Sequence, residues 1–222
     1  MEKVITAIEG QKKNPRRVNI SMINRVPFGL SRIVAAWLKV GQYLSEKQIK
    51  DLQVEDSVES AYQKSLFYLG HRTRSEYEVR KRISKYGFDN NVIQKVISRL
   101  VDKQYLSDRE FAQEWVENRI TFRPRSRSML RYELRQKRVP EDIIAHALHN
   151  IPDEGKLAEK AAKKHSRRLR GLDRRSFQKK LVGYLSRRGF SYDIVKSAID
   201  KLWNEEFDQL NKKNGNEEMK YE

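Results

Sequence analysis

Apolar residues recur in three matching stretches of this sequence, and in each stretch they follow the period of an α-helix. The stretches align on Gly87-Phe88, Arg138-Val139 and Gly189-Phe190, which are evenly spaced along the chain. In the second stretch Leu130 and Leu134 precede the pair at helical spacing, and the other two stretches have aliphatic residues at the same places. Matching apolar positions in three copies indicate an internal structural repeat.

Each copy is predicted to be a helix, a tight turn and a second helix, with a further helix in front. That further helix is expected at 58–69, 108–120 and 154–169. Gly87 and Gly189 suit the left-handed conformation that ends many helices, and Pro140 suits the first position of the helix that follows. The pattern predicts three tandem three-helix bundles in an elongated, curved array, in which each bundle mainly contacts its neighbours.

The first 44 residues follow a different pattern. Short β-prone runs at 4–8 and 18–22 are separated by a polar, turn-forming stretch at 11–15, so we expect a small antiparallel sheet of two or three strands. A short helix is expected at 31–37. From Ser45 onward the pattern is helical, and Ser45-Glu46-Lys47-Gln48 has the arrangement of a capping box. A sheet this small needs a helix packed against it.

The predicted fold class is therefore mostly all-α, with tandem three-helix-bundle repeats in three copies and a small antiparallel β unit at the N-terminus. The expected boundaries are 1–44 for the β unit with its short helix, 45–106 for a linking helix and the first repeat, 107–151 for the second repeat, 152–205 for the third, and 206–222 for a tail. The tail is polar and mixed in charge, so we expect it to be disordered.

The basic residues are numerous and clustered. Lys and Arg total 47 against 30 Asp and Glu, so the formal net charge is +17. Residues 119–138 contain eight Lys or Arg and one acid, Glu133, while residues 160–188 contain twelve and one acid, Asp173. Because the twelve-to-one imbalance has no local carboxylates to balance it, we expect a partner to supply the negative charge, such as a linear polyanion or a helical assembly.

A stripe of arginines is predicted on the helix before the second turn, because Arg127, Arg131 and Arg135 recur every four residues. The helix after that turn, 141–149, contains no Lys or Arg. A helix-turn-helix regulator reads bases with its second helix. The observed distribution therefore favours contacts to the phosphate backbone or to a protein surface over base readout.

Composition disfavours several functional classes. Without cysteine the chain has no disulfide and no thiolate metal site, which suits a reducing cytoplasm. No apolar run is long enough to cross a membrane, and no glycine-rich phosphate loop is present. His146 and His149 lack the further ligands that zinc needs, and Trp37, Trp115 and Trp203 are expected in the core. We expect a monomeric, non-enzymatic protein that binds no metal or cofactor.

Several motifs carry a family resemblance. They are LFYL at 66–69, RTRSE at 72–76, EV at 78–79, YLSD at 105–108, FA at 111–112, WV at 115–116, Arg119 and ELRQK at 133–137, with FGLS at 28–31 and GQYLS at 41–45 near the N-terminus. These resemble the motifs of the RecX family, the bacterial regulatory proteins that modulate the RecA recombinase. Two residues depart from the family pattern, since Arg138 and Ser126 stand where a glycine is common.

The resemblance implies a non-catalytic protein that lies in the groove of the RecA–DNA filament. It would inhibit the recombinase, ATPase and co-protease activities of RecA in DNA repair and the SOS response. The alternative is a stand-alone architectural protein that binds single- and double-stranded DNA through phosphates without sequence specificity, and a cryptic nuclease is a poor third. The residues expected to contact the filament or DNA are Arg72, Arg74, Arg80, Arg119, Arg123, Arg125, Arg127, Arg131, Arg135, Lys164, Arg167, Arg168, Arg174, Arg175, Lys179 and Arg187.

Overall fold

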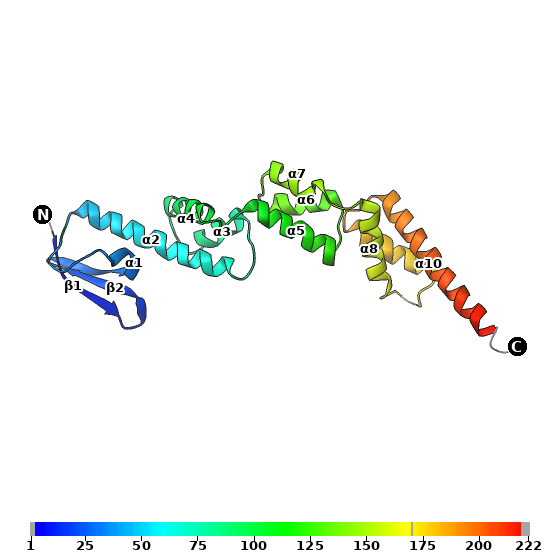
Figure 1. The fold of residues 1–222 in the computed structure, drawn as a ribbon, viewed down its shortest axis with the longest axis horizontal. Coiled ribbons are helices and arrows are strands. Elements are labelled where there is room, and N and C mark those ends of the chain that lie inside the picture. The colour runs from blue at the N-terminus through cyan, green and yellow to red at the C-terminus, as the bar shows by residue number, and fades with distance from the viewer. Residues whose placement is uncertain (1–2, 170, 219–222) are drawn as a thin grey trace. The chain divides into compact units, whose positions relative to one another are not determined.

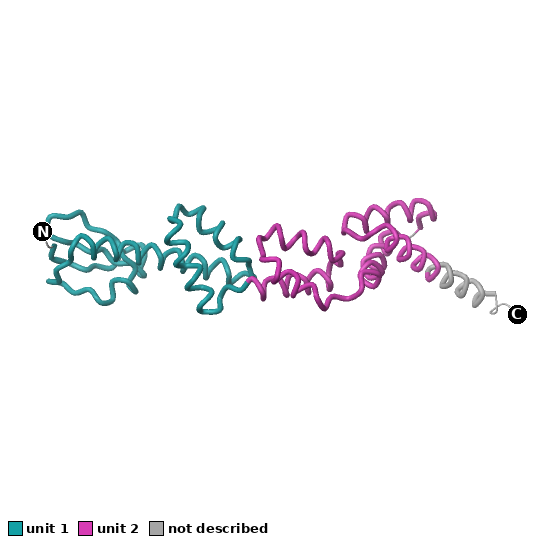
Figure 2. The backbone as a smooth tube through the Cα atoms, turned by 90° about the horizontal axis from the view of Figure 1, so that it is seen from above, with its two compact units in different colours: residues 1–107 teal, residues 108–222 magenta. Residues whose placement is uncertain are grey.

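The computed structural model describes residues 3–169 and 171–218, with side chains described as far as residue 205. The chain folds into two compact units, Met1–Ser107 and Asp108–Glu222 (Figure 2). The first unit contains a β sheet and one helical bundle, and the second contains two further bundles (Figure 1). The predicted fold class, mostly helical with three bundle repeats and a small N-terminal sheet, is confirmed.

The N-terminal sheet has four antiparallel strands in the order β3-β2-β1-β4. They are β1 (Lys3–Gln11), β2 (Asn14–Met22), β3 (Arg25–Ser31) and β4 (Tyr43–Leu44). The sequence predicted two or three strands. The additional strand is the two-residue β4, which is too short to show an alternating pattern of its own. On β2 the alternate residues Val18, Ile20 and Met22 are buried and form the core-facing side of the sheet.

Helix α1 (Arg32–Ala35) follows the sheet, and α2 (Glu46–Leu69) then joins the sheet to the first bundle. The predicted capping box is confirmed, because the Ser45 hydroxyl accepts from the Gln48 N–H and the Gln48 side chain accepts from the Ser45 N–H. Ile49 is buried against the sheet, whereas Ala61 and Tyr62 are buried in the first bundle. One continuous helix therefore contributes to both cores.

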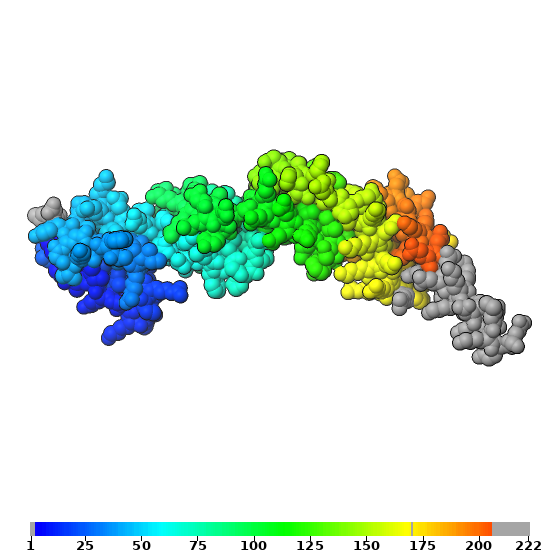
Figure 3. Space-filling view, viewed as in Figure 1, coloured from blue at the N-terminus to red at the C-terminus, as the bar shows by residue number. Residues whose placement is uncertain are grey.

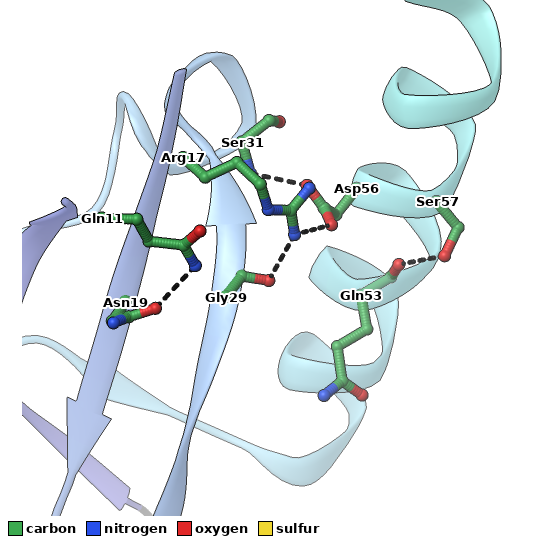
Figure 4. Close-up of polar contacts among 8 residues, drawn as sticks. All are labelled: Gln11, Arg17, Asn19, Gly29, Ser31, Gln53, Asp56 and Ser57. Carbon is green, nitrogen blue, oxygen red and sulfur yellow. Dashed lines mark hydrogen bonds and ion pairs between the residues drawn. The ribbon is translucent and has the colours of Figure 1, made fainter. Parts of the chain in front are cut away.

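The buried carboxylate of Asp56 fastens α2 to the sheet (Figure 4). Asp56 accepts from Arg17 Nη2 on β2 at 2.7 Å and from the backbone N–H of Ser31 at the end of β3. Arg17 also donates to the carbonyl oxygen of Gly29 at 3.0 Å. Loss of Arg17 would leave the buried Asp56 carboxylate without a balancing positive charge, so this pair fixes how the sheet packs on the helix.

Three bundles make up the rest of the chain. The first consists of α2, α3 (Glu76–Ser84) and α4 (Asn90–Asp102), the second of α5 (Asp108–Phe122), α6 (Arg127–Gln136) and α7 (Glu141–His149), and the third of α8 (Glu154–Ser166), α9 (Arg174–Ser186) and α10 (Tyr192–Glu218). Each bundle has its own apolar core. Ile83, Leu134 and Leu185 occupy equivalent places and are fully buried, as the repeat predicts.

The turn inside each repeat passes through the left-handed region at the equivalent residue. The φ angle is +79° at Gly87, +57° at Arg138 and +86° at Gly189. Arg138 therefore adopts the glycine-like conformation of the other copies, at a cost of about 1–2 kcal/mol for a residue with a Cβ. Pro140 is the N-cap residue of α7, with ψ at 146°, so it precedes the first helical position that the sequence predicted for it.

The second and third repeats are in close contact at the start of α6, and their atoms adjoin in the space-filling view (Figure 3). Buried Ser126 caps α6 by accepting from the Met129 N–H at 3.2 Å, and its own N–H donates to the Arg188 carbonyl oxygen at 3.1 Å. A Cβ on Gly189 would collide with the Ser126 hydroxyl and lie 2.9 Å from Met129 Cβ. Serine at 126 thus supplies a helix cap and a contact between repeats.

One further expectation differs from the structure, and another stays a prediction. The disordered tail at 206–222 stays a prediction; the backbone of α10 extends to Glu218, and residues 219–222 lie outside the described range. The prediction of core positions for the tryptophans holds in part. Trp115 and Trp203 pack against the cores of their bundles, but Trp37 lies beyond the end of α1 and is 87% exposed.

Candidate functional site

The arginine stripe of the second repeat is largely neutralised by its own fold. Glu141, the first residue of α7, lies 3.2 Å from Arg131 Nε and 2.8 Å from Arg135 Nε on α6. The hydrogen bond from Arg135 lowers the pKa of Glu141. The count of eight basic residues to one acid over 119–138 therefore overstates the free positive charge of this segment. The sequence count stopped at residue 138, whereas the turn folds the next acid back onto α6.

A second acid holds two more of the predicted contact residues. Glu133 accepts from Arg119 Nε at 2.8 Å and pairs with Arg125 Nε at 2.7 Å, and it also accepts from Trp115 Nε1 at 2.8 Å. The Arg119 guanidinium lies 4.2 Å from the centre of the Trp115 ring. These arginines are half-buried. They are placed to hold α5 and the loop before α6 together.

The remaining arginines of the second repeat differ from each other. Arg127 is directed toward the end of α7, where its guanidinium donates to the carbonyl oxygen of Leu148, and its backbone N–H donates to Glu154 at 2.8 Å. Arg123 is exposed, and no carboxylate among the described residues lies within ion-pair distance of it. Of the six arginines predicted in this repeat, Arg123 therefore has the most freedom to meet a partner.

The predicted contact residues of the first repeat are also engaged within the protein. Arg72 pairs with Glu78 at 3.1 Å, and Arg80 pairs with Glu76 at 2.6 Å. Arg74 is half-buried, with its guanidinium 4.2 Å from the centre of the Tyr68 ring. Acids in the first turn of α3 thus neutralise this cluster, as acids at a helix N-terminus commonly do.

The third repeat differs from the other two because its predicted cations, which are all exposed, lack carboxylate partners in the part of the chain that the structure describes. None of its seven predicted residues has a carboxylate within ion-pair distance among the side chains that the structure describes, and these residues are Lys164, Arg167, Arg168, Arg174, Arg175, Lys179 and Arg187. The one local acid, Asp173, caps α9 by accepting from the Ser176 N–H at 3.0 Å, and this hydrogen bond lowers the pKa of Asp173. The cationic surface of this repeat is not neutralised from within.

Two of these cations, Lys179 and Arg187, line an open hollow of about 560 Å³ between α8 and α9, which we call the basic hollow. Its lining residues are His165, Ser176, Lys179, Lys180, Gly183 and Arg187. The His165 ring stacks on Tyr184 with 3.8 Å between ring centres, and the Arg188 guanidinium lies 4.0 Å from the Tyr184 ring centre. Burial lowers the pKa of His165, and the nearby charges of Arg168, Arg188 and Arg187 lower it further.

Sequence reasoning missed four residues of this hollow. They are His165, Ser176, Lys180 and Gly183. The sequence did contain a signal for this hollow. Gly183 stands one turn after Lys179 and one turn before Arg187, so a glycine lies between two cations on one helix face. Hydroxyl, imidazole and ammonium donors around an open, positive depression form an arrangement that suits phosphate oxygens.

The described part of the chain offers little support for other chemistry. No group of three or more His, Cys, Asp or Glu residues in it could hold a metal ion. His146 and His149 are exposed on α7. Among the described helices, none combines the length and apolarity required to cross a lipid bilayer.

The fold defines a protein built from tandem three-helix repeats, and the third repeat presents exposed cations on its surface. Family models describe each repeat in turn. Residues 61–100 match the first three-helix domain of RecX, 107–148 match the second, and 153–199 match the third. The chain belongs to the RecX family.

Individual relatives agree with this assignment. The chain is 33% identical over 204 residues to the regulatory protein RecX of Bacillus subtilis, covering 89% of this chain and 76% of that protein. It is 32% identical over 203 residues to RecX of Bacillus pumilus, covering 90% and 77%. A crystal structure of a regulatory protein RecX superposes with a TM-score of 0.69 at 28% identity, over 89% of this chain and 99% of the other.

Proposed function

We propose that this protein regulates RecA by binding the RecA–DNA filament and inhibiting its recombinase, ATPase and co-protease activities in DNA repair and the SOS response. It would act as a cytoplasmic monomer without catalysis of its own. The observation that carries the proposal is the basic hollow of the third repeat with the exposed cations around it. Family membership supplies the regulatory role, and the charge supplies the means of attachment.

The basic hollow is suited to the phosphates of DNA inside the filament. Its donors come from two helices, and no described carboxylate competes for them. Attraction of this kind is independent of base sequence, as expected for a regulator that must act wherever a filament forms. We therefore assign phosphate contacts chiefly to the third repeat and to Arg123. The paired arginines of the first two repeats then serve mainly to hold their bundles together.

The proposal is tested by reversing charge in the basic hollow. A triple variant with Lys179→Glu, Lys180→Glu and Arg187→Glu should lose most inhibition of the RecA ATPase on single-stranded DNA. The matched control is Lys12→Glu, Lys13→Glu and Arg16→Glu, which makes the same change in net charge at exposed residues around the β1–β2 turn. Unchanged inhibition by a folded hollow variant, or equal loss in the control, would contradict the assignment.

The second candidate function, a stand-alone DNA-binding protein, is favoured by the same exposed cations. Salt separates the two, because binding through about 6–10 phosphate contacts weakens by about 10³–10⁵ between about 50 and 200 mM salt. Inhibition of RecA that persists at salt concentrations where naked-DNA binding is lost supports filament recognition. Loss of both effects together favours the stand-alone function.

A further inference from the structure

An apolar hollow lies in the first unit, whereas the basic hollow belongs to the second unit. It has a volume of about 440 Å³, and its apolar lining comes from Ile33, Val34 and Trp37 in the α1 region and from Val54 and Val58 on α2. Trp37 is 87% exposed and Ile33 is 63% exposed. A large apolar side chain left in water beside an apolar depression is typical of an interaction site.

The local fold explains how Trp37 comes to face outward. Ala35 is buried and Leu38 packs against the core beneath the sheet, so these two residues anchor the segment. Ile33 and Trp37 lie four residues apart on its other side, where both are exposed. The segment therefore has an inner face that holds it to the protein and an outer apolar face without a partner among the described residues.

The charges around this hollow indicate what kind of molecule it suits. Glu55 and Glu59 come from α2, and Lys95 and Arg99 come from α4. Arg99 is already used, since it pairs with Glu59 at 2.7 Å and lies 3.9 Å from the Tyr62 ring centre. The two acids and two bases of this rim cancel, so the hollow lacks the net positive charge that attracts nucleic acid. A polypeptide with an apolar side chain beside a charged one complements this rim.

We propose that this hollow, formed by Trp37, Ile33, Val34, Val54 and Val58, receives an apolar side chain from a protein partner, with a flanking charge on that partner meeting Glu55 or Lys95. The inference rests on the proposed function, in which that partner is the protein surface of the RecA filament. Recognition is then divided within one chain. The first unit binds protein through apolar contact, and the third repeat binds phosphate.

The test compares Trp37→Ala and Val54→Asp with Phe67→Ala, which removes another exposed aromatic of the same unit that does not line the hollow. Each full-length variant is titrated onto RecA filaments formed on single-stranded DNA and, separately, onto the naked DNA. Buried tryptophans at interfaces commonly contribute 2 kcal/mol or more, so both hollow variants should need about 30-fold more protein for half-maximal ATPase inhibition. Their naked-DNA affinity and their melting temperature should equal those of the control.

Each result has a distinct meaning. Inhibition by the hollow variants equal to that of Phe67→Ala would overturn this inference while leaving the proposed function intact. Absence of filament binding by the unaltered protein would instead overturn the proposed function. Loss of naked-DNA affinity in Trp37→Ala would show that the hollow stacks a base, and a dimer in sedimentation that this substitution dissolves would show that a second copy occupies it. Either of those two results would overturn the inference.

Discussion

The second and third repeats share one fold but treat their positive charge in opposite ways. Glu133 and Glu141 of the second repeat pair with four arginines. At the equivalent positions the third repeat has Tyr184 and Tyr192. Tyr184 forms no ion pair but stacks with His165 and Arg188. The second repeat has two acids where the third has tyrosines. Its arginines form ion pairs within the repeat, whereas the predicted cations of the third repeat form none among the described side chains.

The basic residues themselves are also displaced between the two repeats. Arg127 and Arg135 on α6 correspond to Gln178 and Ser186 on α9, whereas Lys179 and Arg187 stand one position further along. One residue corresponds to about 100° around a helix. The cations of α9 therefore lie on a neighbouring face, out of reach of the start of the next helix. The position of a charge on its helix, more than the number of charges, decides whether it is free.

The largest expected effect concerns the apolar cores of the second and third repeats, which should contribute equally to stability. Leu134→Ala and Leu185→Ala each remove a fully buried side chain at an equivalent place, so each should lower the free energy of unfolding by about 2–5 kcal/mol. Urea denaturation followed by circular dichroism measures this. A loss in one variant several times that in the other would show that the two repeats differ in packing as well as in charge.

The turn glycines should show a smaller but unequal effect. Gly87→Ala meets no atom within 4 Å and should cost only the left-handed penalty of about 1–2 kcal/mol. Gly189→Ala adds a collision with Ser126 and Met129, and overpacking of that kind costs about 1–3 kcal/mol more. Thermal unfolding of the two variants makes the comparison. Equal losses would contradict the contact between the second and third repeats at Ser126.

Much of this fold could be predicted from sequence, because it depends on patterns that repeat. The apolar spacing around Leu134 and the capping box at Ser45 each depend on local chemistry, and both are confirmed. The pairing of Glu141 with Arg131 and Arg135 was missed because it crosses a turn. The exposure of Trp37 was missed because apolar character alone does not distinguish a core side chain from one awaiting a partner. Helices could be predicted from local sequence patterns. Which charges remain unpaired depends on contacts between helices, which those patterns do not reveal.

A charge placed beside the basic hollow should weaken DNA binding to a moderate extent. Tyr184→Glu copies the acid that the second repeat has at this position, and it brings a carboxylate to Arg188 and to His165, which lines the basic hollow. Naked-DNA affinity should fall about tenfold, since each lost phosphate contact is worth about that order. Tyr192→Glu is the matched control, because it makes the same charge change at an exposed residue that neither lines the basic hollow nor stacks on a residue that lines it. Fluorescence anisotropy with labelled single-stranded DNA distinguishes them, and equal losses would indicate a general charge effect.

The smallest expected effect is a pH dependence of DNA binding that arises from His165. In the free protein burial lowers the pKa of His165, and so do the nearby cations Arg168, which follows α8, and Arg187 and Arg188, which follow α9. Lys179 and Lys180 add positive charge to the same hollow. A bound phosphate offsets these charges and favours the protonated ring, so binding takes up protons and must strengthen as pH falls. Between about pH 8 and about pH 6, on either side of the ordinary histidine value, affinity should rise about threefold.

The lowered pKa of His165 has the opposite consequence for the stability of the protein without DNA. This difference allows the origin of the pH-dependent DNA binding to be tested. Because the folded pKa of His165 is lowered, the unfolded chain binds protons more readily, and stability falls as pH drops below the ordinary value near 6.5. His165→Phe keeps a ring to stack on Tyr184 but cannot be protonated. In this variant, the DNA affinity and the stability should both depend less on pH near 6.5 than they do in the unaltered protein. Retention of the full binding profile in His165→Phe would place the titrating group elsewhere and remove His165 from the phosphate site.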